Sequence, residues 1–160
     1  VPYPHVLVED TTAALHALAH AARDRAPACR IAITGSVGKT GVKEAVFNAL
    51  DRGSRGGAHR SVRSYNNHVG VPLSLARMPA DSDYGIFEMG MNHSGEISAL
   101  TAQVKPHVAV ITTIAPAHIE NLGSIEAIAA AKAEIFEAVE AGRTAIIPAA
   151  IPQFAQLRDV

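Results

Sequence analysis

The fold is decided by one stretch of the sequence, Arg30-Ile31-Ala32-Ile33-Thr34-Gly35-Ser36-Val37-Gly38-Lys39-Thr40. Its first five residues form a short apolar run that predicts a β-strand, and a helix-like pattern follows over residues 40–50. Glycines between a strand and a helix let backbone N–H groups close around phosphate oxygens, and the helix N-terminus adds partial positive charge. The stretch therefore predicts a phosphate-binding loop in a strand–loop–helix unit.

Each residue of this loop has a predicted part in holding a nucleotide and its metal ion. Lys39 would reach the β- and γ-phosphates, and the Thr40 hydroxyl would bind Mg²⁺. The full pattern has one more glycine where Ile33 stands, so this is the compact G-x-x-G-K-T form. A glycine turn that precedes a helix by chance is the alternative, but the Lys-Thr pair favours phosphate binding. The predicted cradle comprises Gly35, Ser36, Val37 and Gly38.

Strands and helices alternate along the rest of the chain. We predict strands over 84–88, 107–113 and 144–147, and helices over 71–78, 95–104 and 124–140. A first helix, capped by Thr11 or Thr12, ends before Pro27, and 51–58 is a Gly/Arg/Ser loop. Apolar strands separated by helices indicate an α/β fold of three layers, with a mostly parallel sheet covered on both faces. Such sheets bind ligands at the carboxyl ends of their strands.

Composition narrows the functional classes. A chain of 160 residues is one domain, and 48% hydrophobic with 18% charged residues is typical of a folded protein. The net charge of −1 gives no reason to expect a nucleic acid or an acidic membrane as partner. No apolar stretch is long enough to span a membrane, and the single cysteine, Cys29, favours a cytosolic location. Because the chain begins with Val, we expect a piece of a longer protein.

Two further strand ends carry candidate ligands. The strand over 84–88 ends in Glu88, which is where a nucleotide enzyme places a Mg²⁺ ligand beside its phosphate loop. A solvated glutamate at a strand end is the alternative. His118 follows the next strand, and although a lone histidine is more often structural, parallel strands would bring it to the same edge of the sheet as Lys39 and Glu88.

Lys132 stands where the predicted helix over 124–140 should be apolar. It lies four residues after Ile128 and four before Phe136, within the stripe that faces the core. It is either a lysine that extends to solvent from the edge of the stripe or a buried amine with a lowered pKa. A neutral amine can react with CO₂, which would convert it into an anionic metal ligand.

Five blocks of the sequence together resemble the central ATP-binding domain of the Mur ligase family. They are 34–40, 66–72, 88–92, 117–120 and 131–136. The resemblance implies that 29–160 is this domain, incomplete at its C-terminus. Residues 1–28 would be a lead-in segment and a linker helix from a missing N-terminal domain.

The resemblance also implies an activity, which is ATP-dependent amide-bond formation through an acyl phosphate. Asn66-Asn67, Glu88-Met89-Gly90-Met91-Asn92 and Leu122-Gly123-Ser124 are most similar to the branch that adds D-alanyl-D-alanine to UDP-N-acetylmuramoyl-tripeptide. These two molecules are then the expected partners, in peptidoglycan precursor synthesis in the bacterial cytoplasm. The isolated chain is expected to be inactive as a ligase, because the domains that bind these substrates are missing.

Site roles follow from the same resemblance. ATP would be held by the loop amides and Lys39, with Asn66 and Asn67 among the cofactor-binding residues. Of two expected Mg²⁺ ions, the first would be bound by Thr40 and Glu88. The second would be bound near His118 and Lys132, with Lys132 carrying an N6-carboxyl group.

Two other classes of protein remain open. Another Mur-type or a folylpolyglutamate-type ligase would share the loop, but Asn66-Asn67 and Glu88-Met89-Gly90 argue against it. A non-catalytic nucleotide-binding module or a small kinase would also have the loop, yet a simple kinase needs neither His118 nor Lys132.

Overall fold

The protein is built on a parallel β-sheet. The computed structural model describes residues 3–117, 119–139 and 142–160. Within them the sheet has the strand order β2-β3-β1-β4-β5, and every neighbouring pair is parallel. The strands are β1 (Cys29–Thr34), β2 (Ala58–Arg60), β3 (Tyr84–Glu88), β4 (Val108–Ile111) and β5 (Thr144–Ile146).

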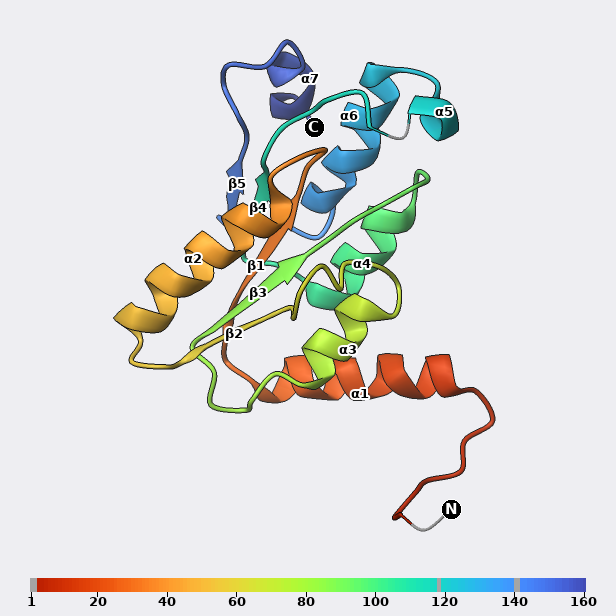
Figure 1. The fold of residues 1–160 in the computed structure, drawn as a ribbon, viewed down its shortest axis with the longest axis vertical. Coiled ribbons are helices and arrows are strands. Elements are labelled where there is room, and N and C mark those ends of the chain that lie inside the picture. The colour runs from red at the N-terminus through yellow and green to blue at the C-terminus, as the bar shows by residue number, and fades with distance from the viewer. Residues whose placement is uncertain (1–2, 118, 140–141) are drawn as a thin grey trace.

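Helices connect these strands and cover the sheet (Figure 1). The longer ones are α1 (Thr11–Arg25), α2 (Lys39–Gly53), α4 (Glu96–Val104) and α6 (Ile125–Ala133). The shorter ones are α3 (Gly70–Ala76), α5 (Ile119–Leu122) and α7 (Phe154–Arg158), and a 3₁₀ helix, η1 (Glu134–Phe136), follows α6. None of the described helices is long and apolar enough to cross a membrane.

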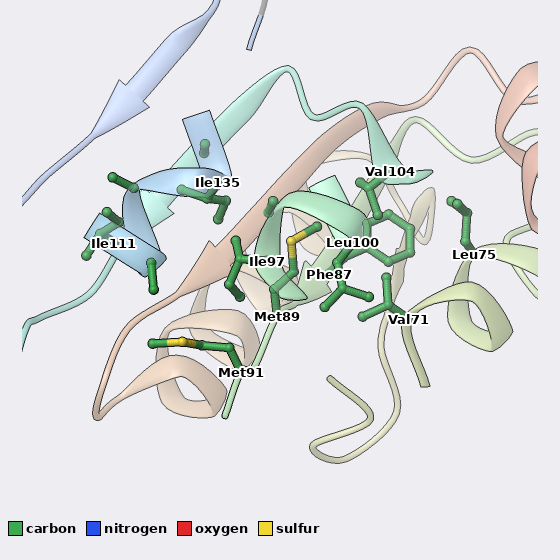
Figure 2. Packing of buried hydrophobic residues seen from close by; sticks show 14 of the residues in the cluster. Val71, Leu75, Phe87, Met89, Met91, Ile97, Leu100, Val104, Ile111 and Ile135 are labelled. Carbon is green, nitrogen blue, oxygen red and sulfur yellow. The ribbon is translucent and has the colours of Figure 1, made fainter. Parts of the chain in front are cut away.

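Each strand contributes side chains to both faces of the sheet, because successive residues of a strand point to opposite faces. Different helices cover the two faces. Ile31 and Ile33 of β1 lie against α2, in a small apolar cluster. Ala32 and Phe87 point to the other face, where α1, α3, α4 and α6 enclose the main core. Figure 2 shows Phe87, Val71 and Leu100 gathered in this core. The predicted three-layer α/β architecture is confirmed.

Element boundaries differ from the prediction in the region 51–60. The predicted loop over 51–58 is partly wrong, because α2 continues to Gly53 and a strand begins at Ala58. This strand, β2, was missed because its sequence, Ala58-His59-Arg60, has no apolar run. It lies at the edge of the sheet, and of the described strands it pairs only with β3.

Three other boundaries also need correction. The helix predicted over 124–140 ends as an α-helix at Ala133, and the strand predicted over 107–113 spans only Val108–Ile111. The cap of α1 is neither Thr11 nor Thr12, since the carboxylate of Asp10 accepts hydrogen bonds from the backbone N–H groups of Thr12 and Ala13. The helix ends before Pro27 as predicted. The division of the chain near residue 28 stays a prediction.

The early end of α6 has a visible consequence. In η1 the Glu134 carboxylate accepts hydrogen bonds from the backbone N–H groups of Gly95 and Ser98, at 2.7 and 3.1 Å. These donors belong to the first turn of α4, where a negative charge is stabilising. Glu134 therefore joins the end of the α6 segment to the start of α4.

Candidate nucleotide and magnesium site

The predicted phosphate loop lies between β1 and α2, against the residues that follow β4. Gly35 has φ +147°, and a Cβ atom there would lie 1.9 Å from Thr112 Oγ1, so only glycine fits. The Thr112 hydroxyl in turn donates a hydrogen bond to the Val37 carbonyl at 2.6 Å. The close approach of these two segments fixes the shape of the loop.

Ser36 and Lys39 are both bound within this arrangement. The Ser36 hydroxyl donates to the Ala115 carbonyl at 2.9 Å and accepts from the Ala115 N–H at 3.0 Å. Lys39 Nζ donates to the Gly35 carbonyl at 2.8 Å, and its side chain is half-buried. The amine that should bind phosphate thus lies over the loop that should cradle it.

Thr40, Glu88 and Asn66 meet beside the loop. The Thr40 hydroxyl donates to Glu88 Oε2 at 2.8 Å, and the Asn66 side-chain amide donates to Glu88 Oε1 at 2.8 Å. Glu88 is only 1% exposed, so the alternative of a solvated strand-end glutamate is wrong. A buried carboxylate needs such donors or a cation, because burying an unpaired charge is costly.

These residues fit a magnesium ion by their chemistry. Mg²⁺ prefers oxygen ligands and commonly takes one or two carboxylates, completing its shell with phosphate oxygens and water. Glu88 supplies a carboxylate and Thr40 a hydroxyl, at the first turn of the helix that follows the loop. The described residues contain no cluster of three or more His, Cys, Asp or Glu side chains that could hold a metal by themselves. This donor set suits an ion that is bound together with a nucleotide.

The two asparagines have different contacts. Asn66 touches Glu88, and its carbonyl accepts from the Gly90 N–H at 2.7 Å. A Cβ atom on Gly90 would lie 2.8 Å from Asn66 Oδ1, so a glycine permits the approach. Asn67 Oδ1 accepts from the N–H groups of Val69 and Gly70 at the start of α3. Asn66 thus reaches the carboxylate, while Asn67 fixes the turn that presents it.

Lys132 is buried, with 2% of its surface exposed. The alternative of a lysine that extends to solvent is therefore wrong. Burial, together with the positive charge of Lys39, lowers the pKa of Lys132 to about 8. Among the described residues no side chain or carbonyl forms a hydrogen bond or ion pair with Lys132 Nζ. A substantial share of neutral amine is the expected state near pH 8.

Four of the predicted residues line one cleft of about 290 Å³, whereas Thr40 and the residues 35–38 of the loop are not in its lining. Its lining includes Lys39, Asn66, Asn67 and Lys132, together with Gly90, Met91, Asn92 and Glu96. Glu88 adjoins this cleft through its hydrogen bond with Asn66. His118 lies outside the described residues, and its role stays a prediction.

Sequence reasoning missed two groups at this site. Glu96, at the cleft, accepts from the Asn92 N–H at 2.7 Å and shapes the turn after β3. Lys43, in α2, is completely buried and lies 3.9 Å from Glu88 Oε2. A lysine beside the apolar positions Val42 and Val46 was the available signal, but only the unpredicted segment after β2 explains its burial.

A phosphate loop between a strand and a helix, with a buried carboxylate at the end of the adjacent strand, defines a P-loop-type nucleotide-binding α/β domain. Comparison with known families makes the class specific. The family model described as "Mur ligase middle domain" matches residues 33–160, so the chain belongs to this family.

Individual relatives agree with this assignment. The chain is 44% identical over 144 residues to UDP-N-acetylmuramoyl-tripeptide--D-alanyl-D-alanine ligase from Rickettsia prowazekii, covering 90% of this chain and 32% of that protein. A crystal structure of MurF from Acinetobacter baumannii superposes with a TM-score of 0.89 at 33% identity, over 99% of this chain and 36% of that one. MurF from Thermotoga maritima in complex with ADP gives 0.83 at 27% identity, over 98% and 36%. The chain spans about a third of the length of its curated relatives.

Proposed function

We propose that the chain is the nucleotide-binding core of an ATP-dependent ligase that joins D-alanyl-D-alanine to UDP-N-acetylmuramoyl-tripeptide. The observation that carries the proposal is the convergence of Lys39, Asn66 and Lys132 on one cleft, with the Thr40–Glu88 pair beside it. The relatives named for this reaction are 34–44% identical to the chain. The complex of the Thermotoga maritima relative with ADP supports nucleotide binding here.

The reaction would proceed in two balanced steps. An oxygen of the tripeptide carboxylate attacks the γ-phosphorus of ATP, which forms an acyl phosphate and releases ADP. The free amine of D-alanyl-D-alanine then attacks the acyl carbon, phosphate leaves, and the nitrogen loses a proton as the amide forms. Both steps develop negative charge on phosphate oxygens, so positioned cations and N–H donors would accelerate them.

The residues of this chain would act by position and charge. The loop amides and Lys39 would bind the phosphates, and the Lys39 charge would stabilise the negative charge on the γ-phosphoryl group during its transfer. Thr40 and Glu88 would hold a first Mg²⁺, and His118 with Lys132, the latter as its N6-carboxyl form, would hold a second. Bound Mg²⁺ would neutralise phosphate charge and orient the transferring group. Asn66 would keep the Glu88 carboxylate aligned, since it donates to the oxygen that Thr40 does not use.

The test is ATP turnover by the full-length protein with defined substrates. We expect ADP release only when both UDP-N-acetylmuramoyl-tripeptide and D-alanyl-D-alanine are present. A heavy oxygen isotope placed in the tripeptide carboxylate should appear in the released phosphate, because the acyl phosphate transfers that oxygen.

The remaining alternatives give different results. Ligation of a single amino acid in place of D-alanyl-D-alanine would assign the chain to another Mur-type ligase, and ligation of glutamate to a folate would indicate a folylpolyglutamate-type ligase. Nucleotide binding without any ligation would leave a binding module. Transfer of phosphate to an acceptor without release of labelled phosphate would indicate a kinase.

A further inference from the structure

Lys43 is a buried cation that none of the proposed chemical steps uses. It lies in α2, one helical turn after Lys39, and is 0% exposed. Its Nζ lies 3.2 Å from Glu44 Oε1 and 3.9 Å from Glu88 Oε2. It also donates to two backbone carbonyls, that of Ser61 at 3.0 Å and that of Arg63. One amine therefore joins two carboxylates and a backbone segment.

The two carbonyls belong to the segment that carries the asparagines. Residues 61–69 connect β2 to α3, and Asn66 and Asn67 lie in its middle. Arg63 has φ +52°, a left-handed conformation that non-glycine residues seldom adopt. Lys43 holds the carbonyl of this same residue. The buried Lys43 ammonium group thus fixes the strained turn that leads to Asn66.

Burial makes this arrangement informative. A lysine withdrawn from water loses its hydration, and it persists only when partners satisfy its charge and its donors. The Lys43 ammonium has three donors, and the two carbonyls and the Glu44 carboxylate can accept them. The side chain is 0% exposed and its three donors have acceptors within the protein, so direct contact with a nucleotide is not its role.

We propose that Lys43 is a positioning residue for the magnesium nucleotide. Its ammonium group fixes the 61–69 segment to α2 and to Glu88, so that the Asn66 amide and the Glu88 carboxylate are held beside Thr40. The inference rests on the proposed function only in taking a magnesium nucleotide as the ligand. Lys43 acts through Glu88 and Asn66, whereas Lys39 and the loop amides contact phosphate without it.

The test compares Lys43→Met with Lys105→Met, the same change at an exposed lysine, in the full-length protein. ADP binding is measured by calorimetry with Mg²⁺ and again with EDTA. We expect Lys43→Met to weaken Mg²⁺·ADP binding at least ~10-fold, the usual effect of losing a partner that orients a metal ligand. ADP binding in EDTA should stay within about twofold, since the phosphate loop is unchanged. Lys105→Met should match the wild type in both conditions.

Amide hydrogen exchange gives a second readout that needs no turnover. In Lys43→Met, exchange in peptides covering 61–69 should accelerate by a larger factor than exchange in peptides of α4, which changes only through global unfolding. Equal ADP affinities in Lys43→Met and wild type would overturn the proposal. So would an equal loss of affinity with and without Mg²⁺ accompanied by the same acceleration of exchange in 61–69 and in α4, because that pattern describes a lysine that only supports the fold.

If Lys43→Met does not fold, Asn66→Ala tests the other end of the connection. It removes the donor to Glu88 and leaves Lys43 with both carbonyls. We expect the same selective loss of Mg²⁺·ADP affinity, and an unchanged affinity would overturn the proposal. Failure of the wild type to bind Mg²⁺·ADP would instead contradict the proposed function. Binding without ligation would contradict the reaction alone.

Discussion

The two buried lysines of this site lie in opposite surroundings. Lys43 has two carboxylates and two carbonyls around its ammonium group, whereas Lys132 has no hydrogen-bond or ion-pair partner among the described residues. The charge that acts on Lys132 is a further cation, Lys39. The first environment stabilises a permanent positive charge, and the second favours a neutral amine. Similar burial therefore indicates a permanently charged positioning group in one case and a reactive or ligand-binding group in the other.

The largest expected effect is on stability, from removing the partnered lysine. Lys43→Ala leaves Glu88 buried without its cation and two carbonyls without their donor. Breaking a buried pair in this way costs about 3–5 kcal/mol. Denaturant unfolding of the variant, with Lys105→Ala as the control, measures the loss. A loss in the free energy of unfolding below about 1 kcal/mol would contradict the interpretation that Lys43 is a partnered cation and Lys132 is not.

The contrast between these lysines also shows which kind of burial a sequence pattern can predict. The sequence identified burial of Lys132 as one of two alternatives, because one helix supplies the apolar stripe that contains it. The burial of Lys43 was not predictable, because its partners lie in the segment after β2, and β2 has no apolar pattern. Local periodicity does not reveal a contact between a helix and the segment that follows an edge strand.

The same distinction applies to the rest of the fold and site. The phosphate loop, β3 and the three-layer parallel sheet were predictable, since each depends on short runs of adjacent residues. Asn66 and Glu88 were identified separately, but their hydrogen bond needs residues 22 positions apart to meet. The role of Glu134 at the start of α4 was missed for the same reason, because it joins segments far apart in the sequence.

The next largest effect is expected at Lys39, whose charge acts on Lys132. Lys39→Ala in the full-length protein should lower ATP-dependent turnover at least ~100-fold, because it removes a cation from the transferring phosphoryl group. Folding should be retained, since Nζ bonds only to the Gly35 carbonyl of its own loop among the described residues. Steady-state kinetics and circular dichroism measure the two properties. Near-normal turnover would remove the phosphate-loop assignment.

The same variant sharpens the comparison of the buried lysines. Loss of the Lys39 charge removes one of the two causes that lower the pKa of Lys132. The pKa of Lys132 should then rise toward its ordinary value, which can be followed by NMR of the labelled amine. An unchanged pKa would mean that burial alone sets it.

An intermediate effect is expected when the unpartnered lysine is removed. Lys132→Ala in the full-length protein should lower turnover roughly 10–100-fold, the range for a lost metal-binding partner. Added formate or acetate should partly restore it by supplying the missing carboxylate. Lys132→Arg should not be rescued, because arginine keeps its charge and occupies the same space. A silent Lys132→Ala would defeat the metal-ligand role, and an impaired variant without rescue would argue against the carboxylated lysine.

The smallest expected effect is a gain in stability that depends on pH. The pKa of Lys132 is about 8 in the folded protein and 10.5 as the ordinary value, so the unfolded chain binds more protons between these two values. Stability of the wild type therefore rises with pH across that window. Lys132→Met has no such group and should be more stable below pH 8, where the cost of the buried charge is fully present, by at most about 3 kcal/mol. The advantage should shrink as the pH approaches 10.5.

Denaturant unfolding at several pH values measures this change in stability. Lys43→Met is the partnered counterpart and should lose stability. A constant advantage at every pH would contradict a titrating amine at Lys132.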